Sequence, residues 1–311
     1  MYLAECEIVA GTGNDCFSPE QLITVEQWAV MLCRAYGAET IGDSWQDVGR
    51  SSVVEAYRQG WLNETALSAP RSPMCRSVLV ESAFAAADVP VYDSTLYEGG
   101  ASLSTADNIL RVGRELGLCS DDADTNALVT RGDAAIILHV VLTQSFRIEE
   151  PPVPVTLVNA AGVNVNDFLL ELRKLPEQVL DAFNAAGWTY RIDFDYISGL
   201  SKKLNMSCIG ATNYSQKTIY LSEASATLHE FGHFLDWTLG FPAEHEQLFR
   251  AEAAAAPLRN YAKTNAREYF ADCFAYWVKY AENANAISLL QECAPMTFRY
   301  MEEVTILQWP D

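Results

Sequence analysis

Apolar side chains recur at helical spacing through the first half of the chain. Between Gln21 and Tyr36 they stand three or four positions apart, and Gly37 offers a C-terminal cap. The same spacing predicts further helices over residues 52–59, 77–87, 104–116 and 131–142. Turn-rich segments separate these helices, so helix, turn and helix recur at a period of roughly 40 to 60 residues, which indicates a repeat array.

The second half mixes helical spacing with alternation. Two predicted helices lie on either side of Pro176, over residues 165–175 and 177–186. Apolar and polar residues alternate over 188–197, which predicts a half-buried strand, and residues 217–221 predict a second short strand. Long helices follow, so this half is expected to have an α+β fold.

A proline-rich segment separates the two halves. Residues 147–154 read RIEEPPVP, a composition typical of an extended connector. We therefore expect a helical repeat domain at 1–146, a linker at 147–154 and a mixed domain at 155–311. A length of 311 residues is also typical of two domains.

Composition narrows the possible partners. The 41 acidic and 21 basic residues give a net charge of −20, and such a surface repels phosphate backbones, so we expect no nucleic-acid partner. The longest apolar stretch, residues 134–142, is too short for a membrane span, and the N-terminus does not follow the signal-peptide pattern. The eight cysteines form no C-x-x-C pair, which disfavours a cysteine zinc site. Buried free thiols and one or two disulfides both remain open.

One segment carries recognisable metal chemistry. Residues 225–240 read SATLHEFGHFLDWTLG, which predicts a helix with an apolar face and contains an H-E-x-x-H motif. His229 and His233 are four positions apart, so they share a face and can bind one metal ion. Glu230 lies about 100° around the helix, where it can reach a water on the open side of the metal. The chain has only four histidines, so we expect this pair to bind Zn²⁺.

A catalytic zinc site needs a third protein ligand and one open position. Residues 265–281 predict a helix on which Glu268 and Asp272 lie one turn apart on a common face. We expect Glu268 to be the third ligand, although spacing alone also allows a surface role, and Asp272 to accept the second N–H of a ligand histidine. Asp236 is either an outer partner of the metal site or a surface residue, and His245 is expected on the surface.

Three segments of the second half resemble a known family, in the family's order. HEFGHFLD, NYAKTNAREYFADCFAYW and ECAPMTFRYMEEV resemble the catalytic domain of anthrax lethal factor and the related Pro-Pro endopeptidases of clostridia and bacilli. The resemblance covers approximately residues 153–311 and implies a zincin-like metallopeptidase of the gluzincin type. It implies five site residues, namely the metal ligands His229, His233 and Glu268, the base Glu230 and the transition-state stabiliser Tyr261.

The first half resembles a different family. IVAGTGNDCFSPEQLITVEQWAVMLCRAYG, DSWQDVGRSSVVEAYRQGWL and LSTADNILRVGRELGL followed by VTRGDAAIILHVVL resemble surface-layer homology (SLH) repeats, which usually anchor bacterial proteins to cell-wall polymers. Only residues 130–133, TRGD, keep the basic residue of the T-R-x-E signature, while Val25 stands where Arg is usual and residues 73–76 read PMCR. Binding to a cell-wall polymer and a packing or spacing role both remain open.

Together these features predict a secreted, cell-surface zinc endopeptidase that acts on a protein or peptide. Two alternatives are a wall-binding or adhesion protein with an inactive zincin domain, and a toxin-like protease that acts on a host protein. We expect an extended substrate to lie against residues 217–222 as an edge strand, with the loop 209–216 as a specificity element. The family resemblance makes cleavage at proline-containing sites one candidate specificity. The loop 209–216 looks shorter than its counterpart in the Pro-Pro endopeptidases, so their strict Pro-Pro specificity is not expected here.

Overall fold

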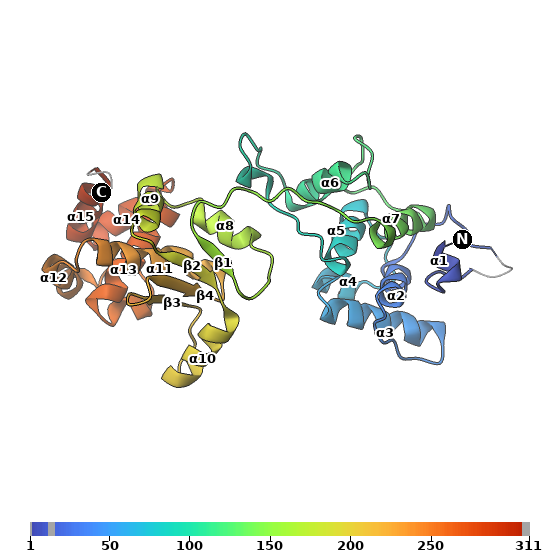
Figure 1. Ribbon diagram of the computed structural model, residues 1–311, viewed down its shortest axis with the longest axis horizontal. Helices are drawn as coiled ribbons and strands as arrows, with labels where there is room; N and C mark the ends of the chain where they lie inside the picture. The colour runs from blue at the N-terminus through green and yellow to red at the C-terminus, as the bar shows by residue number, and fades with distance from the viewer. Residues whose placement is uncertain (1, 12–15, 307–311) are drawn as a thin grey trace. The chain divides into compact units, whose positions relative to one another are not determined.

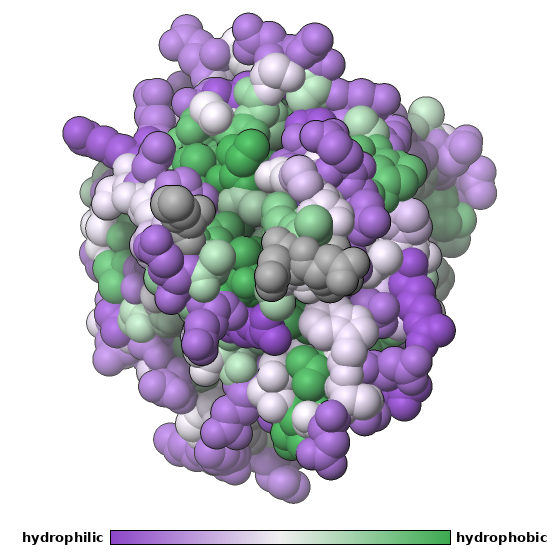
Figure 2. Space-filling view, turned by 90° about the vertical axis from the view of Figure 1, so that its right-hand side faces the viewer, coloured by the Kyte–Doolittle hydropathy of each residue, from purple (hydrophilic) through white to green (hydrophobic). Residues whose placement is uncertain are grey.

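The computed structural model describes residues 2–11 and 16–306. The chain divides into two compact units between residues 151 and 152, a position that lies within the proline-rich segment 147–154. Among the described residues, no helix is both long enough and apolar enough to cross a membrane. Figure 2 shows a face on which hydrophilic side chains predominate, with smaller apolar patches between them.

The N-terminal unit consists of helices joined by turns, as the apolar spacing predicts. Its elements are α1 (Tyr2–Glu5), α2 (Val25–Ala35), α3 (Trp45–Arg58), α4 (Glu64–Ser68), α5 (Arg76–Ala86), η1 (Ser94–Leu96), α6 (Thr105–Glu115) and α7 (Arg131–Thr143). Helix α3 begins earlier than residues 52–59 predict, because the Ser44 side chain accepts the backbone N–H of Asp47 and so caps a longer helix.

Helices α2, α5 and α7 begin at equivalent junctions. The backbone N–H of Ile23 donates to Val129, that of Val129 to Met74, and that of Met74 to Ile23, each over 3.0 Å. These three side chains are buried in the core of the unit. Thr24 and Thr130 then cap α2 and α7 with their side chains. The closed ring of hydrogen bonds ties together three segments that lie far apart in the sequence.

The C-terminal unit combines helices with a small sheet, so its α+β class is confirmed (Figure 1). Its elements are β1 (Leu157–Asn159), α8 (Asn166–Leu172), α9 (Glu177–Ala185), β2 (Thr189–Ile192), α10 (Phe194–Leu204), β3 (Gly210–Asn213), β4 (Thr218–Leu221), η2 (Ala224–Ala226), α11 (Thr227–Thr238), α12 (Ala243–Glu252), η3 (Asn260–Lys263), α13 (Ala266–Lys279), α14 (Ala284–Cys293) and α15 (Pro295–Ile306). The four strands lie in the order β1-β2-β4-β3. Strands β1, β2 and β4 are parallel, and β3 is antiparallel to β4.

Two expectations about the strands are wrong. The strand predicted over 188–197 ends at Ile192, because the Asp193 side chain accepts the N–H of Tyr196 and caps helix α10. The segment 217–222 is not an edge strand, because β4 pairs with β2 on one side and with β3 on the other. The strand at this edge of the sheet is β3, which lies within the segment 209–216 that the sequence predicts to be a loop, and β1 lies at the opposite edge.

Helix α11 lies in the centre of the C-terminal unit. Every residue from Thr227 to Asp236 is buried. The hydroxyl groups of Tyr190 on β2 and Thr227 lie 2.7 Å apart, which couples the sheet to the start of the helix. Gly232 faces α13 so closely that a Cβ atom there would lie 2.6 Å from the Cα of Ala271. This glycine therefore allows α11 and α13 to approach each other where both carry candidate site residues.

The segment from Cys293 to Phe298 has a structural role. The Glu252 carboxylate accepts the backbone N–H groups of Met296 and Thr297, each over 2.8 Å, at the start of α15. The hydroxyl of Thr297 lies 2.8 Å from that of Tyr269 on α13. These buried hydrogen bonds fix α15 against α12 and α13.

Candidate metal centre

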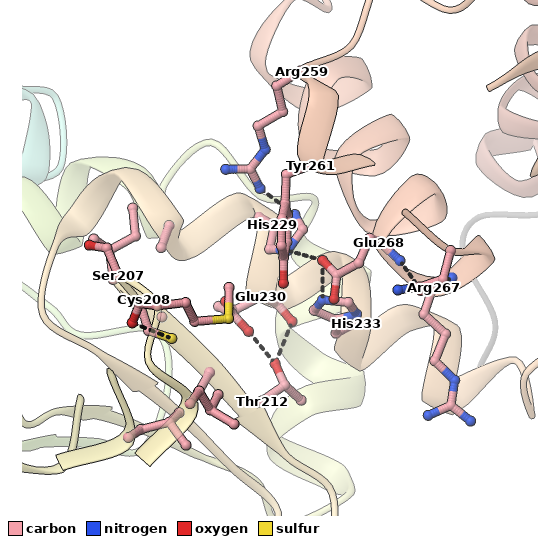
Figure 3. Close-up of a pocket in the computed structure, with 18 of the residues that line it drawn as sticks. Ser207, Cys208, Thr212, His229, Glu230, His233, Arg259, Tyr261, Arg267 and Glu268 are labelled. Carbon is pink, nitrogen blue, oxygen red and sulfur yellow. Dashed lines mark hydrogen bonds and ion pairs between the residues drawn. The ribbon is translucent and has the colours of Figure 1, made fainter. Parts of the chain in front are cut away.

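Three side chains from two helices converge on one point. Nε2 of His229 lies 3.1 Å from Oε2 of Glu268, and Nε2 of His233 lies 3.4 Å from the same oxygen. One donor atom from each residue lies within 4.8 Å of the other two. The two histidines are one turn apart on α11, and Glu268 projects from the first turn of α13, where Asn265 caps the helix (Figure 3). The structure therefore brings together the three ligands expected from the sequence.

The chemistry of these three donors fits a small cation. Oε2 of Glu268 is buried, and no donor among the described residues meets it in hydrogen-bonding geometry. Burial alone would favour the neutral acid, but contacts with both histidines outweigh it and hold the pKa of Glu268 well below its usual range. An anionic oxygen and two imidazole nitrogens on one side of a cleft form the donor set that zinc takes in open, catalytic sites.

The ring of His229 is held from behind by two further side chains. Its Nδ1 lies 2.6 Å from Oδ1 of Asp272, so a proton on Nδ1 is satisfied there and Nε2 is left as a ligand atom. Arg259 donates two hydrogen bonds of 2.7 Å to the two oxygens of Asp272, and its Nη2 lies 3.0 Å from Nδ1 of His229. Burial opposes charge on the ring, yet the contacts with Asp272 and Glu268 raise the pKa of His229 to about 9.

Asp236 and His245 form a separate buried pair, so the expectation that His245 lies on the surface is wrong. Nδ1 of His245 lies 2.7 Å from Oδ1 of Asp236, and its Nε2 lies 2.9 Å from the hydroxyl of Tyr300. The ring of His245 also stacks on Phe270, with centroids 3.8 Å apart. Asp236 thus joins α11 to α12 and α15, and among the described residues no hydrogen bond or ion pair links its side chain to His229, His233 or Glu268.

Glu230 is held between the metal ligands and the edge strand. The hydroxyl of Thr212 on β3 donates to Oε2 of Glu230 over 2.7 Å. On the same strand, a Cβ atom at Gly210 would lie only 2.6 Å from Oε1 of Glu230. The residue Glu230 is 5 % exposed, so the orientation of its side chain is set by packing as well as by the hydrogen bond. This arrangement aims a fixed proton acceptor at the open side of the three ligands.

Tyr261 lies on the other side of the ligands, in helix η3. Its ring centre is 6.3 Å from that of His229, and the guanidinium carbon of Arg259 lies 5.5 Å from its ring centre. Burial, together with the charges of Glu268 and Glu230, raises the pKa of the phenol. Tyr261 therefore stays protonated at neutral pH and is able to donate a hydrogen bond into the cleft.

These groups line a cleft of about 800 Å³. One wall is β3 with the preceding segment that contains Ser207 and Cys208, and the other is formed by residues at and before the start of α13. Figure 3 shows Thr212 of β3 bonded to Glu230, with Cys208 toward one end of the cleft and Arg267 toward the other.

Sequence reasoning missed Thr212, Gly210 and Arg259. Thr212 and Gly210 belong to the four-residue strand β3, which was too short to show alternation. Arg259 reaches Asp272 across thirteen residues and a turn, so no helical spacing links the pair. The sequence did contain one signal for Arg259, because this arginine lies two residues before Tyr261, between the two predicted helices that carry the metal ligands.

Two comparisons with known proteins find similarity. Residues 171–304 match a family model described as anthrax toxin lethal factor, N- and C-terminal domain. Among solved structures, the chain is similar to the Pro-Pro endopeptidase PPEP-2 from Paenibacillus alvei, with 17 % sequence identity, a TM-score of 0.37, and coverage of 48 % of this chain and 96 % of that chain. No curated protein matches the chain. The family match lies within the C-terminal unit and includes the residues of the His-His-Glu cluster.

Proposed function

We propose that this chain is a zinc-dependent endopeptidase that hydrolyses peptide bonds of a protein substrate. The observation that carries the proposal is the convergence of His229, His233 and Glu268 beside the carboxylate of Glu230, inside the segment that matches the lethal factor family. Zn²⁺ held by these three ligands would supply Lewis-acid activation of water and of the scissile carbonyl group.

Glu230 is the general base in this proposal. Its carboxylate takes a proton from the attacking water and later delivers that proton to the leaving amine. Thr212 and the close approach of Gly210 hold the carboxylate in one orientation. Because Glu230 does not rotate freely, little reorganisation is needed when the water attacks.

Tyr261 stabilises the negative charge that develops on the carbonyl oxygen. The phenol donates a hydrogen bond from the side of the cleft opposite β3. Loss of one donor of this kind typically lowers the rate on the order of 100- to 1000-fold. Arg259 packs against the ring and orients it.

The substrate is proposed to add to β3 as an extended strand. Only one edge of β3 is paired within the sheet, with β4, and Gly210, Ala211 and Thr212 line the cleft. An extended peptide on this edge would pass directly beside Glu230. The substrate strand is thus assigned to β3 in place of residues 217–222.

We further propose that the enzyme is exported and held at the bacterial cell surface through its N-terminal unit. The resemblance of residues 1–146 to SLH repeats supports this, together with the three equivalent junctions before α2, α5 and α7. Binding of the full chain to purified cell walls, compared with binding to walls stripped of their secondary polymers, would test this part separately.

The proposal is tested with a mixed peptide library that includes proline-rich members. Wild type and Glu230→Ala protein are incubated with the library, and bound zinc is measured on the same samples. We expect cleavage by the wild type only, with about one zinc in both proteins, because Glu230 is the base and not a ligand. Zinc in both proteins with cleavage by neither would favour a binding protein with an inactive zincin domain.

A further inference from the structure

Arg267 stands at the end of the cleft opposite Ser207 and Cys208 (Figure 3). It directly precedes Glu268 on α13, so it is fixed to the same turn of helix as a proposed metal ligand. No role in the proposed mechanism falls to this side chain. It nevertheless lines the same cleft as Glu230.

Two aromatic rings hold the guanidinium group of Arg267. Its central carbon lies 4.3 Å from the ring centre of Phe241 and 5.9 Å from that of Tyr214. Packing on ring faces restrains a guanidinium plane while its N–H groups remain at the edge, where a planar acceptor can bind them. Tyr214 lines the same cleft, so this end of the cleft has both an aromatic ring and the positive charge of Arg267.

The charge of Arg267 is not matched by a carboxylate. Among the described residues, no carboxylate oxygen lies within 4.0 Å of its guanidinium nitrogens. The other arginine in the cleft wall, Arg259, is bound to Asp272, and the nearby Glu246 is paired with Arg250 over 2.8 Å. Arg267 is thus a restrained cation, free to bind an anion, on a chain whose net charge is −20.

We propose that Arg267, with Phe241 and Tyr214, forms a subsite for a carboxylate of the peptide substrate. The carboxylate comes either from an Asp or Glu side chain near the scissile bond or from the C-terminus of a short peptide. Guanidinium groups bind planar carboxylates through two parallel N–H donors, which gives direction as well as charge complementarity. This inference rests on the proposed function, because it assigns the cleft to peptides.

The expected preference is moderate and sensitive to salt. Arg267 is exposed, so solvent and ions screen its charge. We expect a gain of about tenfold in kcat/KM for the acidic peptide, which shrinks as ionic strength rises.

The test uses pairs of peptides built on a sequence that the zinc-loaded wild type cleaves. In each pair one position carries Glu or Gln, and every peptide is made both with a free C-terminus and with a C-terminal amide. The readouts are two ratios of kcat/KM, that of the Glu peptide to the Gln peptide and that of the peptide with a free C-terminus to its amide. A high ratio in amidated peptides identifies a side-chain carboxylate, whereas an effect confined to free C-termini identifies the terminal group.

Two variants and a matched control make the test specific. Arg267→Gln is expected to bring the ratio close to one, and Arg267→Glu to bring it below one. Arg299→Gln removes the same charge from an exposed position outside the cleft and is expected to keep the wild-type ratio. Wild-type ratios near one both for Glu over Gln at every position and for a free C-terminus over an amide would overturn the proposal. A ratio above one that survives in Arg267→Glu would also overturn it.

Failure of the peptidase proposal remains distinguishable. If the zinc-loaded wild type cleaves no peptide of the mixed library, fluorescein-labelled library peptides made in Glu and Gln versions are titrated with wild type and Arg267→Gln protein. Tighter binding of the Glu peptides that disappears in Arg267→Gln supports the subsite without catalysis. Equal binding of both peptides by both proteins overturns the subsite as well.

Discussion

At the scale of single residues, the position of Glu230 depends on a hydrogen bond from one neighbour and on the absence of a side chain at another. Thr212 donates a hydrogen bond to the carboxylate, and Gly210 leaves the space that the carboxylate fills. Gly210 does not adopt a positive φ, so it is required for space and not for backbone conformation. The base is therefore sensitive to a single added methyl group on β3.

Substitution of Gly210 by Ala is expected to lower kcat/KM by about 10- to 100-fold while zinc remains bound. The new Cβ atom would meet Oε1 of Glu230 at 2.6 Å and the Cβ of Ala226 at 2.9 Å, so the carboxylate must move. Gly199→Ala is the control, because that helical glycine on α10 faces open space. Full activity of Gly210→Ala with normal zinc content would show that this contact does not hold the base.

Sequence reasoning at this scale works where chemistry follows local spacing. His229 and His233 share a face because they are one turn apart, and the same rule places Glu268 and Asp272 together. It fails for His245, whose burial comes from the packing of α12 against α13 and α15, which no local pattern encodes. The same limit applies to Arg259, which reaches Asp272 only through the tertiary fold.

At the scale of elements, the site depends on the close approach of α11 and α13. The backbone of Gly232 faces Ala271 so closely that an added Cβ would lie 2.7 Å from its carbonyl oxygen. One helix supplies both histidines and the other supplies Glu268 and Asp272. A small increase in their separation would move Glu268 and Asp272 away from the histidines together.

Gly232→Ala is expected to destabilise the C-terminal unit by about 1 to 3 kcal/mol and to weaken zinc binding. Extra volume in a closely packed core forces backbone shifts, and here the shift separates α11 from α13. Denaturant unfolding measures the first effect and a competitive zinc titration the second. Unchanged values for both would mean that the two helices approach less closely than described.

The helices could be predicted from the sequence better than the strands. Apolar spacing identifies α2, α5, α6, α7 and α13 to within a few residues, because long amphipathic helices repeat their pattern several times. Strands β1 and β3 have three and four residues, too few to establish alternation, and proline-rich sequence precedes β1. Sheet order is a tertiary property, and this is why the edge strand was misassigned.

At the scale of the whole molecule, each unit contains its own buried thiol. Cys33 lies in the core of the N-terminal unit, where burial raises its pKa to about 11. Cys273 lies on α13 in the C-terminal unit, and burial also raises the pKa of its thiol. Both thiols stay protonated and shielded in the folded chain, so each reacts only when its own unit opens.

Removal of zinc is expected to change the exposure of these two thiols differently. A ligand stabilises the unit that binds it, by about 2.7 kcal/mol at a free concentration 100 times the Kd. With EDTA, Cys273 should be alkylated at lower urea concentration than with zinc, whereas the urea dependence of Cys33 should not shift. Mass spectrometry of the alkylated peptides reports both residues in one sample. An equal shift for both thiols would contradict the assignment of zinc to the C-terminal unit alone.

The central claim is that His229, His233 and Glu268 hold one zinc ion, and zinc stoichiometry tests it most directly. Wild type, Glu268→Ala and the exposed control Glu282→Ala are dialysed against the same buffered zinc, and metal per chain is measured by elemental analysis. We expect about one zinc in wild type and in Glu282→Ala. For Glu268→Ala we expect zinc affinity to fall by more than roughly 10- to 100-fold, which is the loss typical when a residue that is hydrogen-bonded to a metal ligand is removed. Wild-type protein without zinc, or Glu268→Ala that binds it as tightly as wild type, would contradict the claim.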